Sequence, residues 1–278
     1  MVVNFKVLIQ LIYQKYEKLS KIGEGAFGKV YKGQNKETKE YVAIKEIPLQ
    51  EIEGMNIKEE TEKEIKFMKI FNDCPNSVKL YDVYEENNTI FLVLELCDTD
   101  LSKCVEKSKN GLTIYEVKIA MKQFNNILQE MRKRDMIHND VKIENVLIKF
   151  GQNKEFQVKL MDYGNSKLIS STKDLSDNEY GIKPYTQGGK DILYIVEKID
   201  LFNLGIDLYR MVFKEAFKTI EEMHAKIDKL EDKELKDLMK KLIVEDEKKR
   251  LDWEDYFNHN FFKIDKFDFD KVINIVKN

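Results

Sequence analysis

The sequence predicts an α+β fold in which a small strand-rich lobe precedes a larger helical lobe. Strand patterns with one helical interval run through residues 16–95, and helical periodicity dominates after Cys97. The chain has 278 residues, which is enough for two lobes that share a cleft. We expect an N-terminal extension (1–15), a first lobe (16–95), a second lobe (96–265) and a C-terminal tail (266–278), with the cleft at the junction of the lobes.

The elements of the first lobe follow from alternation and turn residues. Residues 16–35 alternate around a glycine-rich turn, and residues 40–47 form a short β-branched run. Residues 56–71 change to helical spacing, with an apolar stripe formed by Ile57, Ile65, Met68 and Phe71. Two strands are then expected in residues 77–96, separated by an Asn-Asn pair that is typical of a tight hairpin turn.

The second lobe is predicted to be mainly helical, because apolar residues recur there at helical spacing. The expected helices cover residues 114–134, 200–213, 234–244 and 253–262. Between them, residues 137–189 are rich in loops, with short strands at residues 146–150 and 157–162.

Composition and charge bound the function. Hydrophobic residues make up 42% of the chain and charged residues 35%, as in a globular protein with a core. The net charge of −3 gives no reason to expect nucleic acid or an anionic membrane as a partner. Cys74, Cys97 and Cys104 have no metal-ligand spacing and cannot all pair, so we expect a reducing, cytoplasmic location, alone or within a large assembly.

The first 13 residues, MVVNFKVLIQLIY, are apolar but too few to span a bilayer, and Asn4 and Lys6 interrupt them. They lack a small-residue cleavage signal. We expect a short element packed on the domain rather than a targeting segment. Docking onto a partner remains open.

The first chemical motif is a glycine loop. Gly23, Gly25 and Gly28 give the pattern G-x-G-x-x-G, and glycines let backbone N–H groups approach phosphate oxygens closely. The pattern is followed by a strand that contains Val30, not by the helix of a dinucleotide-binding fold. A glycine-rich hairpin without a ligand is the alternative.

The next motif pairs a lysine with a glutamate. Lys45 ends the apolar run VAIK, where a buried ammonium group is costly unless it is paired. Glu64, in the middle of the predicted helix, is a suitable partner, and a phosphate would add to the pair. The alternative is a lysine and a glutamate that both lie on the surface.

Two further motifs, HNDVKIEN (138–145) and MDYG (161–164), carry groups suited to phosphate transfer. Asp140 could accept a hydroxyl proton, and Lys142 could neutralise a phosphate. Asn145 and Asp162 offer the hard oxygen ligands that Mg²⁺ prefers. Alternatively, Asp140 and Asp162 are capping or turn residues, which is common for aspartate.

These four motifs, in this order, resemble the eukaryotic protein kinase family over residues 16–262. Lys142, two residues after Asp140, is similar to the serine/threonine branch. The resemblance implies a bilobal protein-kinase-like fold with the ATP site in the cleft. It also implies Mg²⁺ and ATP as cofactors and a protein substrate whose Ser/Thr hydroxyl receives the γ-phosphate.

The resemblance further implies a role for each matched residue. On the nucleotide side, the amides of residues 24–28 would cover the phosphates, and Lys45, paired with Glu64, would grip them. Leu94 would be the gatekeeper, followed by two residues whose backbones bind the adenine edge, Glu95 and Cys97. The adenine would lie between Val30, Ala43 and Leu147.

On the transfer side, Asp140 would be the base, Lys142 would assist at the phosphate, and Asn145 and Asp162 would bind Mg²⁺. A stack of Met68, Leu80, His138 and Tyr163, anchored by Asp200, is similar to the regulatory spine of the family.

Three departures from the family pattern lie on the side of the protein substrate. Asn139 replaces an arginine that pairs with an activation-loop phosphate, and Ile182 replaces a threonine that bonds the catalytic residues. Gly189 stands where a glutamate would pair with Arg250. The function we expect is a serine/threonine protein kinase. The alternatives are an ATP-binding pseudokinase that serves as a scaffold or structural subunit, and a small-molecule kinase on a related fold. The substrate and the oligomeric state stay open.

Overall fold

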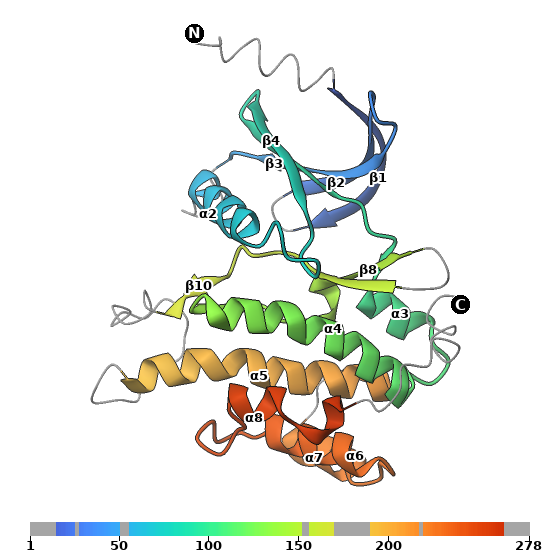
Figure 1. Cartoon of the computed structure of the whole chain (residues 1–278), viewed down its shortest axis with the longest axis vertical. Coiled ribbons are helices and arrows are strands. Elements are labelled where there is room, and N and C mark those ends of the chain that lie inside the picture. The colour runs from blue at the N-terminus through green and yellow to red at the C-terminus, as the bar shows by residue number, and fades with distance from the viewer. Residues whose placement is uncertain are drawn as a thin grey trace. The chain divides into compact units, whose positions relative to one another are not determined.

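The computed structural model describes residues 15–25, 28–50, 56–151, 156–169, 190–216 and 219–263. The chain divides into two compact units, Met1–Asp98 and Thr99–Asn278. The first unit is built on a sheet and the second is mainly helical (Figure 1).

The first unit is a five-stranded antiparallel sheet with one helix, α2 (Ile57–Ile70), along one face (Figure 1). The strand order is β1-β2-β3-β5-β4. The strands cover Tyr16–Gly25 (β1), Gly28–Asn35 (β2), Tyr41–Pro48 (β3), Leu80–Glu86 (β4) and Thr89–Glu95 (β5).

Two hairpins of this sheet, β1–β2 and β4–β5, were expected from turn residues, and the second shows why. Asn87 and Asn88 join β4 to β5 with φ angles of 48° and 58°. Such positive φ angles fit the twist of a two-residue hairpin, and asparagine adopts them more readily than most residues. The Asn-Asn prediction is therefore confirmed.

Helix α2 begins at a capping residue and buries a stripe that is only partly apolar. The Asn56 side chain accepts a hydrogen bond from the Glu59 amide at 3.2 Å, which satisfies one free N–H group of the first turn. Ile65, expected in the buried stripe, is only partly buried, and Phe67 takes its place. Glu64 also lies in the buried stripe, so this helix carries a charge toward the sheet.

The sheet is apolar on both faces. Side chains alternate along β3, so Val42 and Ile44 point to one face while Ala43 and Lys45 point to the other. The first face carries a buried cluster in which Tyr84 and Phe91 stack with centroids 4.7 Å apart. The cluster consists of Tyr16, Val42, Ile44, Tyr84, Phe91 and Val93. The second face is the one that holds Lys45.

The second unit contains six α-helices among the residues described. They are α3 (Leu101–Lys107), α4 (Ile114–Lys133), α5 (Lys190–Phe213), α6 (Ile220–Ile227), α7 (Lys233–Leu242) and α8 (Trp253–Phe257). Short strands form two small sheets, ordered β6-β8-β9 and β10-β7. Their bounds are Thr99–Asp100 (β6), Met136–Ile137 (β7), Val146–Phe150 (β8), Phe156–Leu160 (β9) and Lys167–Leu168 (β10).

Two helices differ from the sequence prediction. Helix α5 begins at Lys190, ten residues before the predicted start at 200. The helix predicted over 253–262 stops at Phe257 and is followed by a 3₁₀ turn, Asn260–Phe262. The break is stabilised by His259, whose ring Nδ1 accepts the Phe261 amide at 3.2 Å. Helices α3 and α6 were not predicted.

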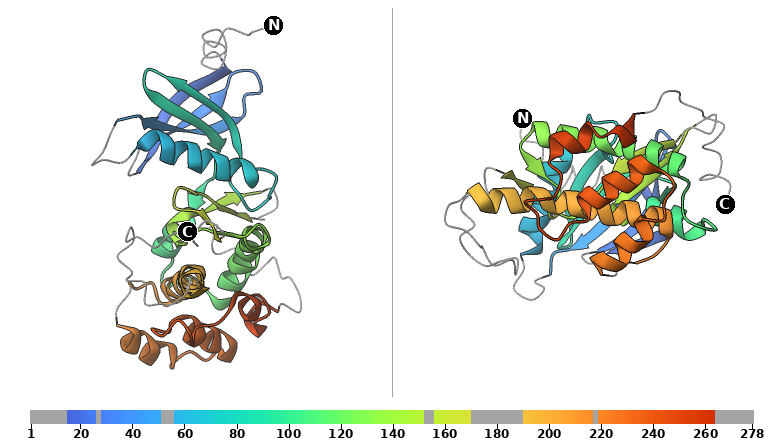
Figure 2. Two further views of the ribbon diagram at one scale, coloured as in Figure 1. Left: turned by 90° about the vertical axis from the view of Figure 1, so that its left-hand side faces the viewer. Right: turned by 90° about the horizontal axis from the view of Figure 1, so that it is seen from below.

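Helix α4 contacts the small β6-β8-β9 sheet and packs beside α5. Figure 2 shows α4 and α5 nearly end-on, side by side. The Gln123 amide of α4 pairs with the edge of β9: it donates to the Phe156 carbonyl at 3.1 Å and accepts the Val158 amide at 3.0 Å. These bonds fix β9, the strand that leads to Asp162. None of the helices in the described ranges is long and apolar enough to cross a membrane.

Candidate active site

In the first unit, the predicted nucleotide residues share one face of the sheet. Val30 faces Lys45 across β2 and β3, and Ala43 faces Leu94 across β3 and β5. Residues opposite each other lie on the same side, and so do residues two apart along a strand. Gly23, opposite Val30, joins the same face. The sheet register therefore brings the lysine, three apolar side chains and the glycine loop together.

Lys45 and Glu64 form the expected pair. The Lys45 ammonium nitrogen lies 2.8 Å from Glu64 Oε1 and 2.9 Å from Oε2. The side chains are only 21% and 10% exposed. A pair this well shielded orients both groups, because breaking it leaves a charge in a poorly hydrated place. The alternative of two surface residues is wrong.

The glycines of the loop meet different surroundings. A Cβ at Gly28 would lie 1.9 Å from the Glu46 carbonyl oxygen, so the close approach of β2 to β3 demands glycine there. A Cβ at Gly25 would meet no atom of the described residues within 4 Å. Packing against the described part of the chain does not explain Gly25, and the space beside it suits an external group. Residues 26 and 27 lie outside the described ranges.

The remaining adenine candidates lie at the end of β5 and on β8. Leu94 is partly exposed, while Glu95 is buried and donates its amide to the Lys79 carbonyl at 2.8 Å. Cys97 follows β5 and is partly exposed. Leu147, also partly exposed, belongs to the second unit.

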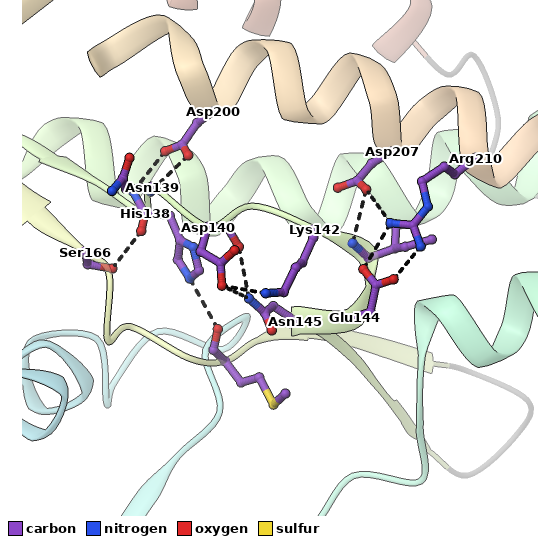
Figure 3. Close-up of polar contacts among 12 residues, drawn as sticks. His138, Asn139, Asp140, Lys142, Glu144, Asn145, Ser166, Asp200, Asp207 and Arg210 are labelled. Carbon is purple, nitrogen blue, oxygen red and sulfur yellow. Dashed lines mark hydrogen bonds and ion pairs between the residues drawn. The ribbon is translucent and has the colours of Figure 1, made fainter. Parts of the chain in front are cut away.

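In the second unit, the catalytic-type loop converges on one carboxylate (Figure 3). Asp140 Oδ2 accepts from the Lys142 ammonium at 2.7 Å and from the Asn145 amide nitrogen at 3.1 Å. The same amide nitrogen also donates to the Asp140 carbonyl at 2.9 Å. Lys142 and Asn145, which sequence spacing grouped with Asp140, are thus both hydrogen-bonded to its carboxylate.

Asp162 is tied to this loop through its neighbour. The Met161 amide donates to the Asn145 carbonyl at 3.0 Å, and the Met161 carbonyl lies 3.2 Å from His138 Nε2. Asp162 itself has a φ of 64°, an unusual conformation that concentrates at functional sites.

The donor set at this point fits Mg²⁺ bound together with phosphates. Because the Asn145 nitrogen faces Asp140, its amide oxygen is left for another partner, and Asp162 adds a carboxylate. Mg²⁺ is commonly held by one or two such side chains plus phosphate oxygens. Among the described residues, no group of three or more His, Cys, Asp or Glu side chains could hold a metal without such help.

The start of the catalytic-type loop, His138 and Asn139, is hydrogen-bonded to α5. Asp200 accepts the backbone amides of His138 and Asn139, each at 2.9 Å, and burial raises the pKa of its carboxyl. The His138 ring packs against Tyr163 with centroids 5.5 Å apart. The part of the predicted spine that belongs to this unit is therefore present. Met68 and Leu80 are buried in the first unit.

The end of the loop is held by residues that sequence analysis did not single out. Asp207 Oδ1 accepts the Ile143 amide at 3.2 Å, and Arg210 donates both terminal nitrogens to the Glu144 carboxylate (Figure 3). One signal was available in the sequence. Asp200, Asp207 and Arg210 recur at spacings of seven and three in the mainly apolar stretch 200–213, which places them on one face of the helix.

The comparison with known families decides the identity. The sequence-family model of the protein kinase domain matches residues 16–262. The chain belongs to the protein kinase family. The resemblance and the α+β bilobal fold class are thereby confirmed. Protein kinases in general use ATP and Mg²⁺.

Several curated protein kinases are similar to the chain. It is 31% identical to serine/threonine-protein kinase atg1 of Dictyostelium discoideum, over 89% of this chain and 39% of that protein. It is 35% identical to cyclin-dependent kinase-like 1 of Caenorhabditis elegans, over 59% of this chain and 44% of that protein. It is also 35% identical to cyclin-dependent kinase-like 4 of Mus musculus, over 56% of this chain and 44% of that protein. The chain spans less than half the length of these relatives.

The departures from the kinase pattern can be followed only in part, because Ile182 and Gly189 lie outside the described residues. Arg250, the expected partner of the missing glutamate, donates to the carbonyls of Lys198 at 2.9 Å and Val244 at 2.8 Å. Its guanidinium also lies 4.8 Å from the centre of the Phe202 ring. Among the described residues, two backbone carbonyls and an aromatic ring thus contact this arginine.

Proposed function

We propose that this protein kinase domain transfers the γ-phosphate of Mg-ATP to a serine or threonine hydroxyl of a protein. The observation that carries the proposal is the convergence of Lys142 and Asn145 on the Asp140 carboxylate. Phosphoryl transfer depends mainly on positioning and electrostatics, and such a prearranged group of a base, a cation and a metal ligand supplies both.

In this proposal the second unit handles the hydroxyl and the transferred phosphate. Asp140 accepts the proton of the attacking hydroxyl, a step that contributes about a hundredfold or more in comparable enzymes. Lys142 balances the negative charge of the moving phosphate. Asn145 and Asp162 hold Mg²⁺, which neutralises charge on the phosphate oxygens when it is bound.

The first unit holds the rest of the nucleotide. Lys45, fixed by Glu64, binds the α- and β-phosphates, and the backbone around Gly25 covers them. Val30, Ala43 and Leu94 contact the adenine together with Leu147 of the second unit, and the backbones of Glu95 and Cys97 bind its edge. The proposal requires both units to contact the same nucleotide.

A second candidate is an ATP-binding pseudokinase that acts as a scaffold. Asn139 favours it, because an uncharged side chain replaces the arginine that reads a phosphate in the family. The first candidate remains our conclusion, since Asn139 keeps its backbone bond to Asp200 and the groups around Asp140 are intact. We further propose a cytoplasmic location, in line with the cysteine usage.

A transfer assay with a mixed panel of protein and peptide substrates tests the proposal. Wild-type protein with labelled Mg-ATP should phosphorylate at least one substrate on serine or threonine. Asp162→Asn should abolish the signal, which controls for a contaminating kinase. Transfer at background across the panel, with nucleotide binding intact, would favour the scaffold.

A further inference from the structure

The second half of the catalytic loop has its own anchor on α5. Asp207 Oδ1 accepts the Ile143 amide at 3.2 Å. Arg210, one turn further along the helix, forms a two-pronged ion pair with Glu144, with Nη1 lying 3.0 Å from Oε2. Arg210 Nη1 also lies 3.6 Å from Asp207 Oδ1. We call Asp207, Arg210 and Glu144 the loop clamp.

The loop clamp holds the residues that lie between Lys142 and Asn145. Ile143 and Glu144 form most of a short 3₁₀ turn, Ile143–Asn145, that lies directly after Lys142. The clamp holds one of these residues by its backbone and the next by its side chain. Lys142 and Asn145, the two residues that bind Asp140, are the immediate neighbours on either side.

Asp207 is a costly residue to keep at this position. It is only 4% exposed, and its second oxygen, Oδ2, is buried with no hydrogen-bond partner among the described residues. Burying a carboxyl group with an unsatisfied oxygen destabilises a fold. Arg210 is too distant to form a strong bond with it. Asp207 therefore weakens the core but holds the Ile143 amide. Its presence is better explained by a role in positioning the loop than by a contribution to stability.

We propose that Arg210 and Asp207 are positioning residues, which hold the 3₁₀ turn so that Lys142 and Asn145 stay aligned on Asp140. The proposal rests on the proposed function and extends it to residues outside the kinase motifs. In this proposal Arg210 acts through Glu144 and is not itself a catalytic residue.

The proposal predicts an unusual combination of effects. The ion pair is partly exposed, at 27% for Arg210 and 43% for Glu144, and such pairs contribute little to stability. Small displacements of catalytic groups nevertheless cost much in rate. Loss of the pair should therefore lower kcat strongly while leaving the melting temperature and the KM for ATP nearly unchanged.

The first test measures kcat, the KM for ATP and the melting temperature. Arg210→Gln and Glu144→Gln should each lower kcat about tenfold or more, and the double variant should be no worse than either single one, because both remove the same interaction. Arg210→Lys should restore part of the rate. The control is Lys226→Gln, which breaks a similarly exposed ion pair with Glu215 far from the loop residues in sequence. Equal effects of the control, or unchanged kcat in both clamp variants, would overturn the proposal.

The second test needs no activity. Hydrogen exchange of the Ile143 amide should be faster in Arg210→Gln and Glu144→Gln than in wild type or Lys226→Gln, because the turn is less firmly held. If wild-type protein transfers no phosphate, the proposed function fails, and hydrogen exchange alone then decides whether the clamp holds the turn. Exchange that is the same in all four proteins would overturn the clamp.

Discussion

Individual glycines of the loop should respond differently to the same substitution. Gly28→Ala forces a side chain against the Glu46 carbonyl oxygen, 1.9 Å from the new Cβ, so β2 and β3 must move apart. We expect a loss of about 1–3 kcal/mol in the free energy of unfolding. Gly25→Ala meets no atom of the described residues within 4 Å, so it should leave stability nearly unchanged but weaken ATP binding. Thermal unfolding and an ATP titration of both variants measure this. Equal destabilisation by the two variants would contradict it.

The buried carboxyl of Asp207 should make stability depend on pH. Burial raises its pKa from 3.8 to about 7, and the nearby charges of Arg210 and Lys142 offset this only in part. A group whose pKa is raised by folding contributes stability below pH 3.8, and this contribution is lost as the pH rises through about 7. Asp207→Asn cannot titrate and can still accept the Ile143 amide.

Melting temperatures at pH 5 and pH 8 test whether the contribution of Asp207 to stability falls as the pH rises. Relative to Asp207→Asn, wild-type protein should be less stable at pH 8 than at pH 5. Glu144, whose pKa is lowered by its hydrogen bond from Arg210, is present in both proteins, so its titration largely cancels. A difference between the two proteins that stays constant with pH, or shifts the other way, would rule out the assignment.

Asn139 shows how a single residue can depart from a family pattern without disturbing the backbone. Its φ is 61°, in the left-handed region, where asparagine is favoured over most residues. Its amide still bonds Asp200. The replacement therefore removes a positive charge but suits the loop conformation. The lost charge is evident from the sequence, whereas the fit of asparagine to the backbone is visible only in the structure.

At the scale of elements, the pair between β3 and α2 and the turn after β9 should both matter for nucleotide binding. Mg-ATP should raise the melting temperature of the wild-type protein, by the equivalent of about 2.7 kcal/mol at roughly a hundred times its Kd. Lys45→Ala and Asp162→Asn should each remove most of the rise. If neither substitution changes it, the site lies elsewhere. Lys58→Ala, which breaks an exposed pair with Glu85, is the matched control.

Elements with strong local signals were predictable from the sequence. The hairpin at Asn87–Asn88 and strands β3 and β8 follow from turn chemistry and β-branched runs. Helix α6 was missed because its eight residues, Ile220–Ile227, give too short a periodic pattern, although Thr219 and Glu222 form a capping box. The early start of α5 at Lys190 was missed for another reason, since residues 190–199 were assigned neither to the loop-rich segment 137–189 nor to the helix predicted from residue 200.

The contacts of the candidate site also divide into those that could be inferred from the sequence and those that could not. Asp140, Lys142 and Asn145 lie within six residues of one another, so their convergence could be inferred from spacing. The Lys45–Glu64 pair spans nineteen residues and was inferred from the cost of burying a lysine. Arg210 lies 66 residues from Glu144, and only the packing of α5 under the loop brings them together. Contacts of that range require the fold.

For the whole molecule, the loss of charge at Asn139 predicts how activity is regulated. A phosphate on Ser170, Ser171, Thr172 or Ser176, all outside the described residues, lacks the arginine partner that the family pattern provides. We expect phosphatase treatment to change the transfer rate less than twofold. The measurement compares treated and mock-treated protein after removal of the phosphatase. A large loss that a kinase reaction restores would show that another cation reads the phosphate.

Asp140 is proposed to act as the base in phosphate transfer, and Mg-ATP binding is expected not to depend on it. Asp140→Asn keeps the size of the side chain and removes the base. Transfer to the best substrate and the affinity for Mg-ATP are therefore measured on wild type and Asp140→Asn. We expect the ATP affinity to stay within about twofold of the wild-type value while transfer falls about a hundredfold or more. Wild-type transfer that survives Asp140→Asn undiminished would contradict the mechanism, even in a protein that binds ATP.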